Sequence, residues 1–175
     1  MIYKVNENTG NHEYLGDKYL LSVSGGKDST AMILYLKEIA VRKEQMQFVF
    51  MDTGWESSET YGYLEYLESE LEISIDRIRA GIQIKDEHAA FYSEIMHVME
   101  REHSDFVAMV LNDLYFPAGN RQICTPLLKV RPFIDYVKSQ DDEFVSCVGI
   151  RREESSKRST YDEYEYNEHQ DLWVW

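Results

Sequence analysis

The sequence of 175 residues predicts an α/β protein with three layers: a doubly wound, mostly parallel sheet that carries helices on both faces. Two observations predict this fold. Short apolar runs alternate with longer segments whose apolar residues recur at helical spacing. The first apolar run also stops at a pair of glycines and leads directly into a helical pattern, as a βα unit of a parallel sheet does. Ligands of such sheets bind beyond the carboxyl ends of the strands.

The first half of the chain contains two strand–helix units. Residues 19–23 are mostly apolar and predict a buried strand, and residues 29–43 predict a helix with basic side chains toward its C-terminal end, where the helix dipole favours cations. Residues 47–51 repeat the apolar pattern and predict the second strand. An acidic amphipathic helix is expected from Ser57 through residue 72.

The second half of the chain is expected to complete the sheet. Residues 73–78 alternate apolar with polar side chains and predict a third strand. Helical spacing recurs over 91–101, 106–114 and 126–138. Residues 144–150 predict the fourth strand, which ends in a charged turn.

Three regions follow from this pattern. Residues 1–18 are polar and predict an N-terminal arm or a loose hairpin, and residues 19–158 form the expected nucleotide-binding domain. Residues 159–175 carry five acids, three tyrosines and two tryptophans but no Lys or Arg. We interpret this tail either as a solvated segment with a few packing aromatics or as a docking segment for a partner.

Composition excludes several classes of protein. The formal net charge of −14 means that the chain as a whole repels phosphate backbones, so nucleic acid is expected only through a local basic patch or a partner. Two cysteines are too few for a disulfide scaffold or for the four ligands of an iron–sulfur cluster, so no cluster is expected. No apolar stretch approaches the ~20 residues of a membrane span, and the first residues lack the apolar core of a signal peptide. We therefore expect a cytoplasmic protein that binds no membrane.

One loop carries the strongest chemical signal, and it lies between the first strand and the first helix. Its glycines permit close backbone approach, and the N-terminus of the following helix adds partial positive charge, so the loop suits an anion. Lysine can neutralise a phosphate, the serine hydroxyls can donate to it, and the aspartate can hold a magnesium-bound water or cap the helix. A turn that only joins strand to helix is the alternative. The residues of this candidate cradle are Ser22 at the strand end, then Ser24, Gly25, Gly26, Lys27, Asp28 and Ser29.

The string Ser-Gly-Gly-Lys-Asp-Ser fits neither the Walker pattern nor the dinucleotide pattern; it resembles the pyrophosphate-binding loop of the PP-loop ATP pyrophosphatase superfamily. Three further stretches are similar to the branch that contains phosphoadenylyl-sulfate reductases and the ATP pyrophosphatases of DNA phosphorothioation. The resemblance implies an adenine nucleotide alpha hydrolase-like fold. It spans most of residues 24–158.

Two of these stretches are expected to contact the nucleotide. Asp52-Thr53-Gly54, followed by a Glu-Thr pair, resembles the branch's D-T-G…E-T segment. Such a segment can contact the adenosine through backbone amides and the Asp52 carboxylate. The alternative is that these residues only cap a helix and form a turn. The other stretch resembles G-x-R-x-x-E-S-x-x-R. In it, arginines can clamp phosphate or sulfate, the glutamate can hold an arginine, and a self-paired charge run is the alternative. Its matching residues are Gly149, Arg151, Glu154, Ser155 and Arg158.

The last stretch resembles the family's R-x-C-T-x-x-x-K segment. By this resemblance Arg121 and Lys129 line the acceptor side of the site, and Glu154 and Ser155 also belong to the substrate side. Cys124 has two alternative interpretations: it is a small residue packed in the core, or it is a reactive thiolate that the nearby Arg121 favours. Cys147, inside an apolar strand, is expected to be core packing.

Two features depart from the resemblance. The reductases carry a nucleophilic cysteine in a C-terminal tail, and this sequence has no cysteine after Cys147. Members of the branch also continue into a segment resembling Asp-x-Trp-x-x-Arg-Pro, whereas this sequence stops at Trp175. We therefore expect either a minimal natural form or a chain that a protein partner or a homo-oligomer completes.

The leading hypothesis is a magnesium-dependent ATP pyrophosphatase that adenylylates an acceptor, for sulfur transfer or modification of a nucleic acid or nucleotide. The resemblance implies ATP and Mg²⁺ as cofactors, with Asp28 reaching the metal through water, and Lys27, Ser29 and Arg151 as catalytic residues that face charge on the leaving group. One alternative is an oxidoreductase similar to phosphoadenylyl-sulfate reductase, in which only Cys124 can serve. The other is a nucleotide-binding interaction subunit without turnover.

Overall fold

The computed structural model describes residues 2–5, 12–16, 18–39, 41–118, 123–142, 144–151, 153, 160, 165–167 and 172–174. By internal contacts the chain divides into two compact units. Unit 1 comprises residues 1–50, 62–76 and 140–175, and unit 2 comprises residues 51–61 and 77–139. Each unit is described by itself.

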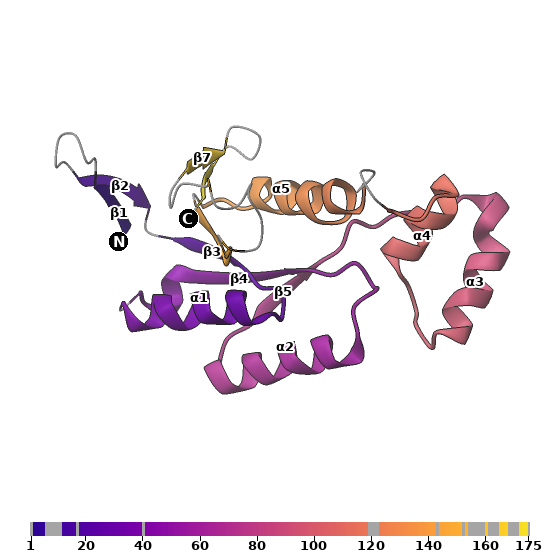
Figure 1. The fold of residues 1–175 in the computed structure, drawn as a ribbon, viewed down its shortest axis with the longest axis horizontal. Coiled ribbons are helices and arrows are strands. Elements are labelled where there is room, and N and C mark those ends of the chain that lie inside the picture. The colour runs from indigo at the N-terminus through magenta and orange to yellow at the C-terminus, as the bar shows by residue number, and fades with distance from the viewer. Residues whose placement is uncertain are drawn as a thin grey trace. The chain divides into compact units, whose positions relative to one another are not determined.

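A mostly parallel sheet forms the framework (Figure 1). Its strand order in the part of the chain that is described is β5-β4-β3-β6-β8-β7. The central strand β3 pairs in parallel with β4 on one side and with β6 on the other, so that Leu21 lies opposite both Phe48 and Cys147. The bounds are β3 (Tyr19–Ser22), β4 (Met46–Met51), β5 (Ile75–Ile78), β6 (Val145–Val148), β7 (Glu165–Asn167) and β8 (Leu172–Val174).

The strand order confirms the predicted α/β fold class with a doubly wound sheet. From β3 the chain adds β4 and then β5 outward on one side, and β6 later joins the opposite side of β3. This reversal creates a topological switch point between β3 and β6, and ligands of doubly wound sheets bind at such points. β3 is a central strand, and its Tyr19, Leu20 and Leu21 are fully buried, which explains why its sequence is mostly apolar.

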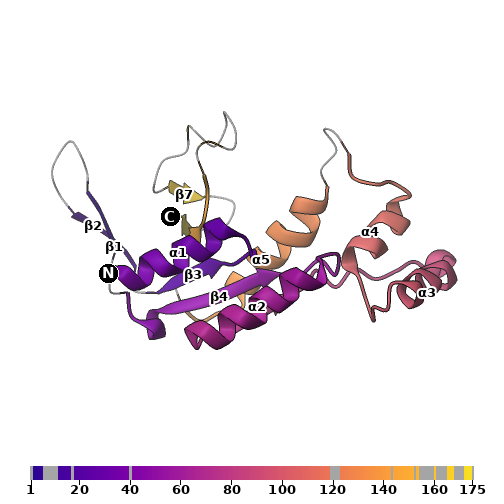
Figure 2. The same ribbon diagram turned by 60° about the horizontal axis from the view of Figure 1, so that its bottom comes forward.

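The helices of unit 1 lie where the pattern predicted them, with shifted ends. α1 (Lys27–Glu38) begins two residues earlier than expected, because Gly26 is its N-cap, and the chain then forms a short 3₁₀ turn, η1 (Lys43–Gln45). α2 (Ser58–Leu71) is the acidic helix. α1 and α2 run beside one another in Figures 1 and 2, and the hydroxyls of Thr30 and Tyr63 meet at 3.2 Å.

Unit 2 is mainly helical. A 3₁₀ turn, η2 (Asp86–His88), leads into α3 (Ala89–Val98), which packs beside α4 (Asp105–Asp113) through a buried apolar cluster that includes Tyr92, Met96 and Val107 (Figure 2). The helix predicted over 126–138 consists of a π-helical turn, η3 (Pro126–Val130), that runs into α5 (Arg131–Lys138).

The two ends of the chain add strands. β1 (Ile2–Val5) and β2 (His12–Gly16) form a separate antiparallel hairpin. The C-terminal tail contributes β8, which pairs in parallel with β6, and β7, which pairs antiparallel with β8. Neither strand was predicted, because three residues are too few to show an alternation of apolar and polar side chains. In the described part of the chain, no helix combines the length and apolarity that a membrane crossing requires.

Candidate functional site

The loop between β3 and α1 is shaped by its two glycines. Gly25 has a φ of 71°, in the left-handed region that favours glycine. Gly26 is the extended N-cap of α1, and no side chain caps the helix there. The first N–H groups of an α-helix have no acceptor within the helix, so this end of α1 offers backbone donors to an anion.

The two serines of the loop hold its shape. Ser29 is buried, and its hydroxyl donates to the carbonyl oxygen of Gly26 at 2.9 Å. The Ser29 oxygen also lies 3.2 Å from the Ser24 hydroxyl and accepts from the Ser24 amide at 3.2 Å, while the Gly26 amide donates to the Ser24 hydroxyl at 3.3 Å. Because the hydroxyl of Ser29 donates its proton to a carbonyl oxygen within the loop, Ser29 acts as a positioning residue in this structure. Lys27 and Ser24 are exposed.

The end of β6 meets this loop across the switch point. A Cβ atom on Gly149 would lie 2.7 Å from the carbonyl carbon and oxygen of Asp28 and 2.9 Å from the Ser29 amide nitrogen, so only glycine fits. Two residues later, Arg151 Nε donates to Asp28 Oδ2 at 2.9 Å. The fold therefore joins two predicted motifs that lie about 120 residues apart in the sequence.

Asp28 was the predicted magnesium residue, and in this structure it pairs with Arg151. Among the residues with described positions, no group of three His, Cys, Asp or Glu side chains could hold a metal ion. Magnesium sites on nucleotides commonly use one or two carboxylates together with phosphate oxygens and water. The partly exposed carboxylate of Asp28 fits a metal that arrives with a nucleotide, and it does not form a protein metal site by itself.

Asp52, in unit 2, directly follows β4 and is almost fully buried. Its Oδ1 accepts from the Gly54 amide at 2.9 Å and from Tyr61 Oη at 2.7 Å, and its Oδ2 accepts from Arg79 Nε at 2.8 Å and Nη2 at 2.6 Å. Burial by itself raises the pKa of Asp52, but the hydrogen bonds from Tyr61, Gly54 and Arg79 outweigh it and hold the pKa below its ordinary value. Burial and the bond to Asp52 raise the pKa of Tyr61, and the same carboxylate raises the pKa of Arg79.

Four donors occupy the four lone-pair positions of the Asp52 carboxylate. The expected contact between that carboxylate and adenosine therefore requires one of these bonds to break. The amides of Gly54 and Trp55 also donate within the turn, to Asp52 and to Thr53 and Glu56, so their contact with adenosine stays a prediction. The carboxylate itself orients Arg79 and the turn that begins at Thr53.

The turn after Asp52 is fixed within unit 2. Gly54 has a φ of 72°, and a Cβ atom there would lie 2.7 Å from the Ser104 Cα atom. Arg101 donates to the carbonyl oxygens of Gly54 and Glu56, and the Phe106 amide donates to the Thr53 carbonyl oxygen at 3.0 Å. The Asp-Thr-Gly segment is thus a rigid turn whose conformation requires its glycine.

The substrate-side residues fall into two groups. Cys124 is partly exposed and Lys129 is exposed, and both belong to unit 2. Cys147 is fully buried, and burial raises the pKa of its thiol to about 12, as expected for core packing. The remaining predicted residues lie outside the described part of the chain; they are Arg121, Glu154, Ser155 and Arg158.

Arg79 and Arg101 are polar residues that sequence reasoning missed. Arg79 comes immediately after β5, so the rule that site residues follow the carboxyl ends of strands would have singled it out. Arg101 follows α3 and donates to the backbone oxygens of Gly54 and Glu56, contacts that no local pattern indicates.

Comparisons with known proteins show the family to which the chain belongs. The family model described as the phosphoadenosine phosphosulfate reductase domain matches residues 18–172. An uncharacterized protein of Methanocaldococcus jannaschii is 27% identical over 151 residues, which is 85% of this chain and 26% of that protein. An uncharacterized 37.8 kDa protein of Escherichia phage 186 is 50% identical over 52 residues, which is 30% of this chain and 15% of that protein. The chain thus spans about a quarter or less of the length of these relatives.

Proposed function

Because the chain belongs to the phosphoadenosine phosphosulfate reductase domain family of the PP-loop ATP pyrophosphatase superfamily, we propose that it is an ATP pyrophosphatase that transfers the adenylyl group of ATP to an acceptor. Members of this family bind nucleotides and are generally enzymes. The observation that carries the proposal is the contact of the Ser24–Ser29 loop with Gly149 and Arg151 at the switch point of the sheet.

The loop supplies the features that a pyrophosphate group needs. The uncapped N-terminus of α1 presents backbone N–H groups and the positive end of a helix of 12 residues. Lys27 is exposed beside it and adds a full positive charge. We assign the β- and γ-phosphates of ATP to this loop.

The reaction that follows is a displacement at phosphorus. An acceptor oxygen attacks the α-phosphorus, a new oxygen–phosphorus bond forms, and the bond to the bridging oxygen breaks as pyrophosphate leaves. Negative charge grows on the leaving group, where Lys27 and Arg151 stabilise it. Asp28 orients Arg151, and Ser29 holds the loop in place, so both act as positioning residues.

Magnesium, when bound to the nucleotide, neutralises charge on the phosphate oxygens. Asp28 is the loop carboxylate that would hold such a metal, directly or through water. Lys27 and the backbone amides of the loop bind phosphate rather than metal.

The acceptor is the open part of this proposal. We propose sulfur transfer or modification of a nucleic acid or nucleotide, in keeping with the family. A net charge of −14 disfavours direct binding of a polymer, so a small acceptor or a partner that presents the polymer fits better.

The test is magnesium-dependent release of pyrophosphate from ATP, with AMP appearing once water or a sulfur or nitrogen nucleophile displaces it from the adenylylated acceptor. Lys27→Ala is expected to lower turnover by about 10²-fold or more, since it removes a cation that faces the leaving group. Lys37→Ala is the matched control, because Lys37 is exposed in the last turn of the same helix and should leave turnover unchanged. Tight binding of ATP without turnover would contradict the proposed enzymatic activity and would favour a nucleotide-binding interaction subunit.

A reductase reaction is the second candidate, and the partial exposure of Cys124 favours it. The Cys124 thiolate would attack the sulfur of phosphoadenylyl sulfate, forming a cysteine S-sulfonate and releasing the nucleotide. Two thiols of a reductant would then be oxidised to a disulfide as sulfite leaves and the Cys124 thiol is regenerated. Cys124→Ser should abolish this activity. Retained turnover of the sulfated nucleotide in that variant would rule the reductase out.

A further inference from the structure

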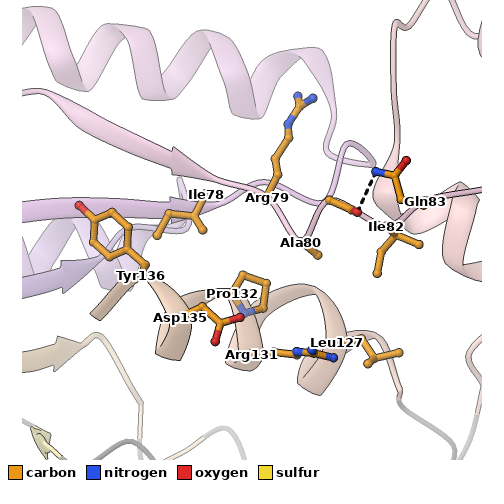
Figure 3. Close-up of a pocket in the computed structure, with 11 residues that line it drawn as sticks. Ile78, Arg79, Ala80, Ile82, Gln83, Leu127, Arg131, Pro132, Asp135 and Tyr136 are labelled. Atoms are coloured by element: carbon orange, nitrogen blue, oxygen red, sulfur yellow. Dashed lines mark hydrogen bonds between the residues drawn. The ribbon is translucent and has the colours of Figure 1, made fainter. Parts of the chain in front are cut away.

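Unit 2 contains a pocket of about 510 Å³ that the proposed function does not use. One wall is the segment from the end of β5 through residue 83, and the other wall is formed by η3 and α5 (Figure 3). A volume of this size is typical of sites for small molecules. The apolar part of the lining includes Ile78, Ala80, Ile82, Leu127, Pro132 and the ring of Tyr136.

The wall that follows β5 is held in place by polar contacts from Asp105 and Asn112. The carboxylate of Asp105, which is 1% exposed, accepts from the Ile82 amide at 2.7 Å and from the Gly81 amide at 3.2 Å. The Asn112 side chain donates to the Gln83 carbonyl oxygen at 2.7 Å. The pocket is therefore preformed, and a ligand would bind without first ordering this wall.

The charged lining residues are Arg79, Arg131 and Asp135. Arg131 and Asp135 lie four residues apart on α5, which is one helical turn and about 6 Å along the axis. Within the described part of the chain, neither side chain has a hydrogen-bond or ion-pair partner, although opposite charges at this spacing commonly pair. The positive charge of Arg79 is balanced by Asp52, to which its guanidinium donates, and the side chain extends away from α5 (Figure 3).

We propose that this pocket binds a free amino acid with an apolar side chain. The carboxylate of the ligand pairs with Arg131, its ammonium group pairs with Asp135, and its side chain enters the apolar part of the lining. A nucleotide carries two or more negative charges and would face Asp135, whereas an uncharged apolar ligand would leave both charges without a partner. The proposal concerns unit 2 alone and does not rest on nucleotide turnover.

The test is calorimetric titration of the whole chain, without nucleotide, using three ligands of one shape: L-leucine, 4-methylpentanoate and 3-methylbutylamine. We expect L-leucine to bind about tenfold or more tightly than either of the others, because each analogue lacks one charged group. Equal affinity for all three ligands, or no binding of L-leucine and of L-phenylalanine, would overturn the proposal.

Variants assign the two charges. Arg131→Gln should lower the affinity for 4-methylpentanoate and L-leucine and spare 3-methylbutylamine, and Asp135→Asn should do the reverse for the two analogues. Lys138→Gln is the matched control, since Lys138 lies on α5 outside the pocket and should change nothing. Leu127→Trp fills the apolar part and should abolish binding, with thermal unfolding used to verify the fold. Retained affinity in Leu127→Trp, or saturable binding of AMP that displaces L-leucine and disappears in Leu127→Trp, would contradict an amino acid pocket.

Discussion

The contact between Gly149 and the Asp28 backbone can be tested by adding a single methyl group. In Gly149→Ala the new Cβ atom would lie 2.7 Å from the carbonyl carbon and oxygen of Asp28, and the loop would have to move by about 0.7 Å to restore ordinary contact at 3.4 Å. Overpacking of this kind costs about 1–3 kcal/mol of unfolding free energy. A misplacement near 1 Å of groups that position a substrate lowers turnover by about 10²-fold.

Two assays separate these effects. Urea unfolding measures the loss of stability. Titration with a fluorescent ATP analogue measures its affinity for the chain, which we expect to fall by about tenfold or more when the loop is displaced. The control is Gly62→Ala, because a Cβ atom on Gly62, within α2, meets nothing within 4 Å. That variant should gain about 0.5–1 kcal/mol from its better helix propensity and bind the analogue normally. If Gly149→Ala matched Gly62→Ala in both assays, the switch-point contact would have no bearing on the cradle.

Two further predictions concern titratable groups. The pKa of Asp52 is lower in the folded chain than in the unfolded chain, so in acid the unfolded chain binds more protons. The stability that Asp52 contributes is therefore present above its unfolded pKa of about 3.9 and is lost as the pH falls through the folded pKa. Asp52→Asn should therefore lower the unfolding free energy by about 1–3 kcal/mol at pH 7. Urea unfolding should show that the difference in unfolding free energy between the unchanged chain and the variant becomes smaller below about pH 4. A difference that does not change with pH would contradict the role of the charge. For the two cysteines, iodoacetamide at neutral pH should modify Cys124 and spare the buried Cys147, whose pKa is raised to about 12. Mass spectrometry should find one modified cysteine in the native chain and two in denaturant, and rapid labelling of Cys147 would refute its burial.

Much of the fold was predictable because its signals are local. The apolar runs at β3, β4 and β6 reflect the burial of neighbouring residues in a strand, and the helical spacing of α1 and α2 reflects the burial of one face of each helix. Both patterns are visible in a short window of the sequence. The loop from Ser24 to Ser29 was predictable for the same reason, since its glycines and its place before a helix are neighbours in the chain. The strands β7 and β8 were missed, because their stability comes from pairing with β6 and with each other rather than from their own short sequences.

The sequence by itself determined the α/β class, the order of the main strands and helices, and the position of the glycine-containing loop between β3 and α1. Only the tertiary structure decided which partners the charged side chains take: Asp28 with Arg151, and Asp52 with Arg79 and Tyr61. Such partners come from distant parts of the chain, and the strand order of the sheet brings them together. The physical reason is that hydrogen bonds and ion pairs depend on distances of about 3 Å between particular atoms, and no local pattern of residues encodes those distances.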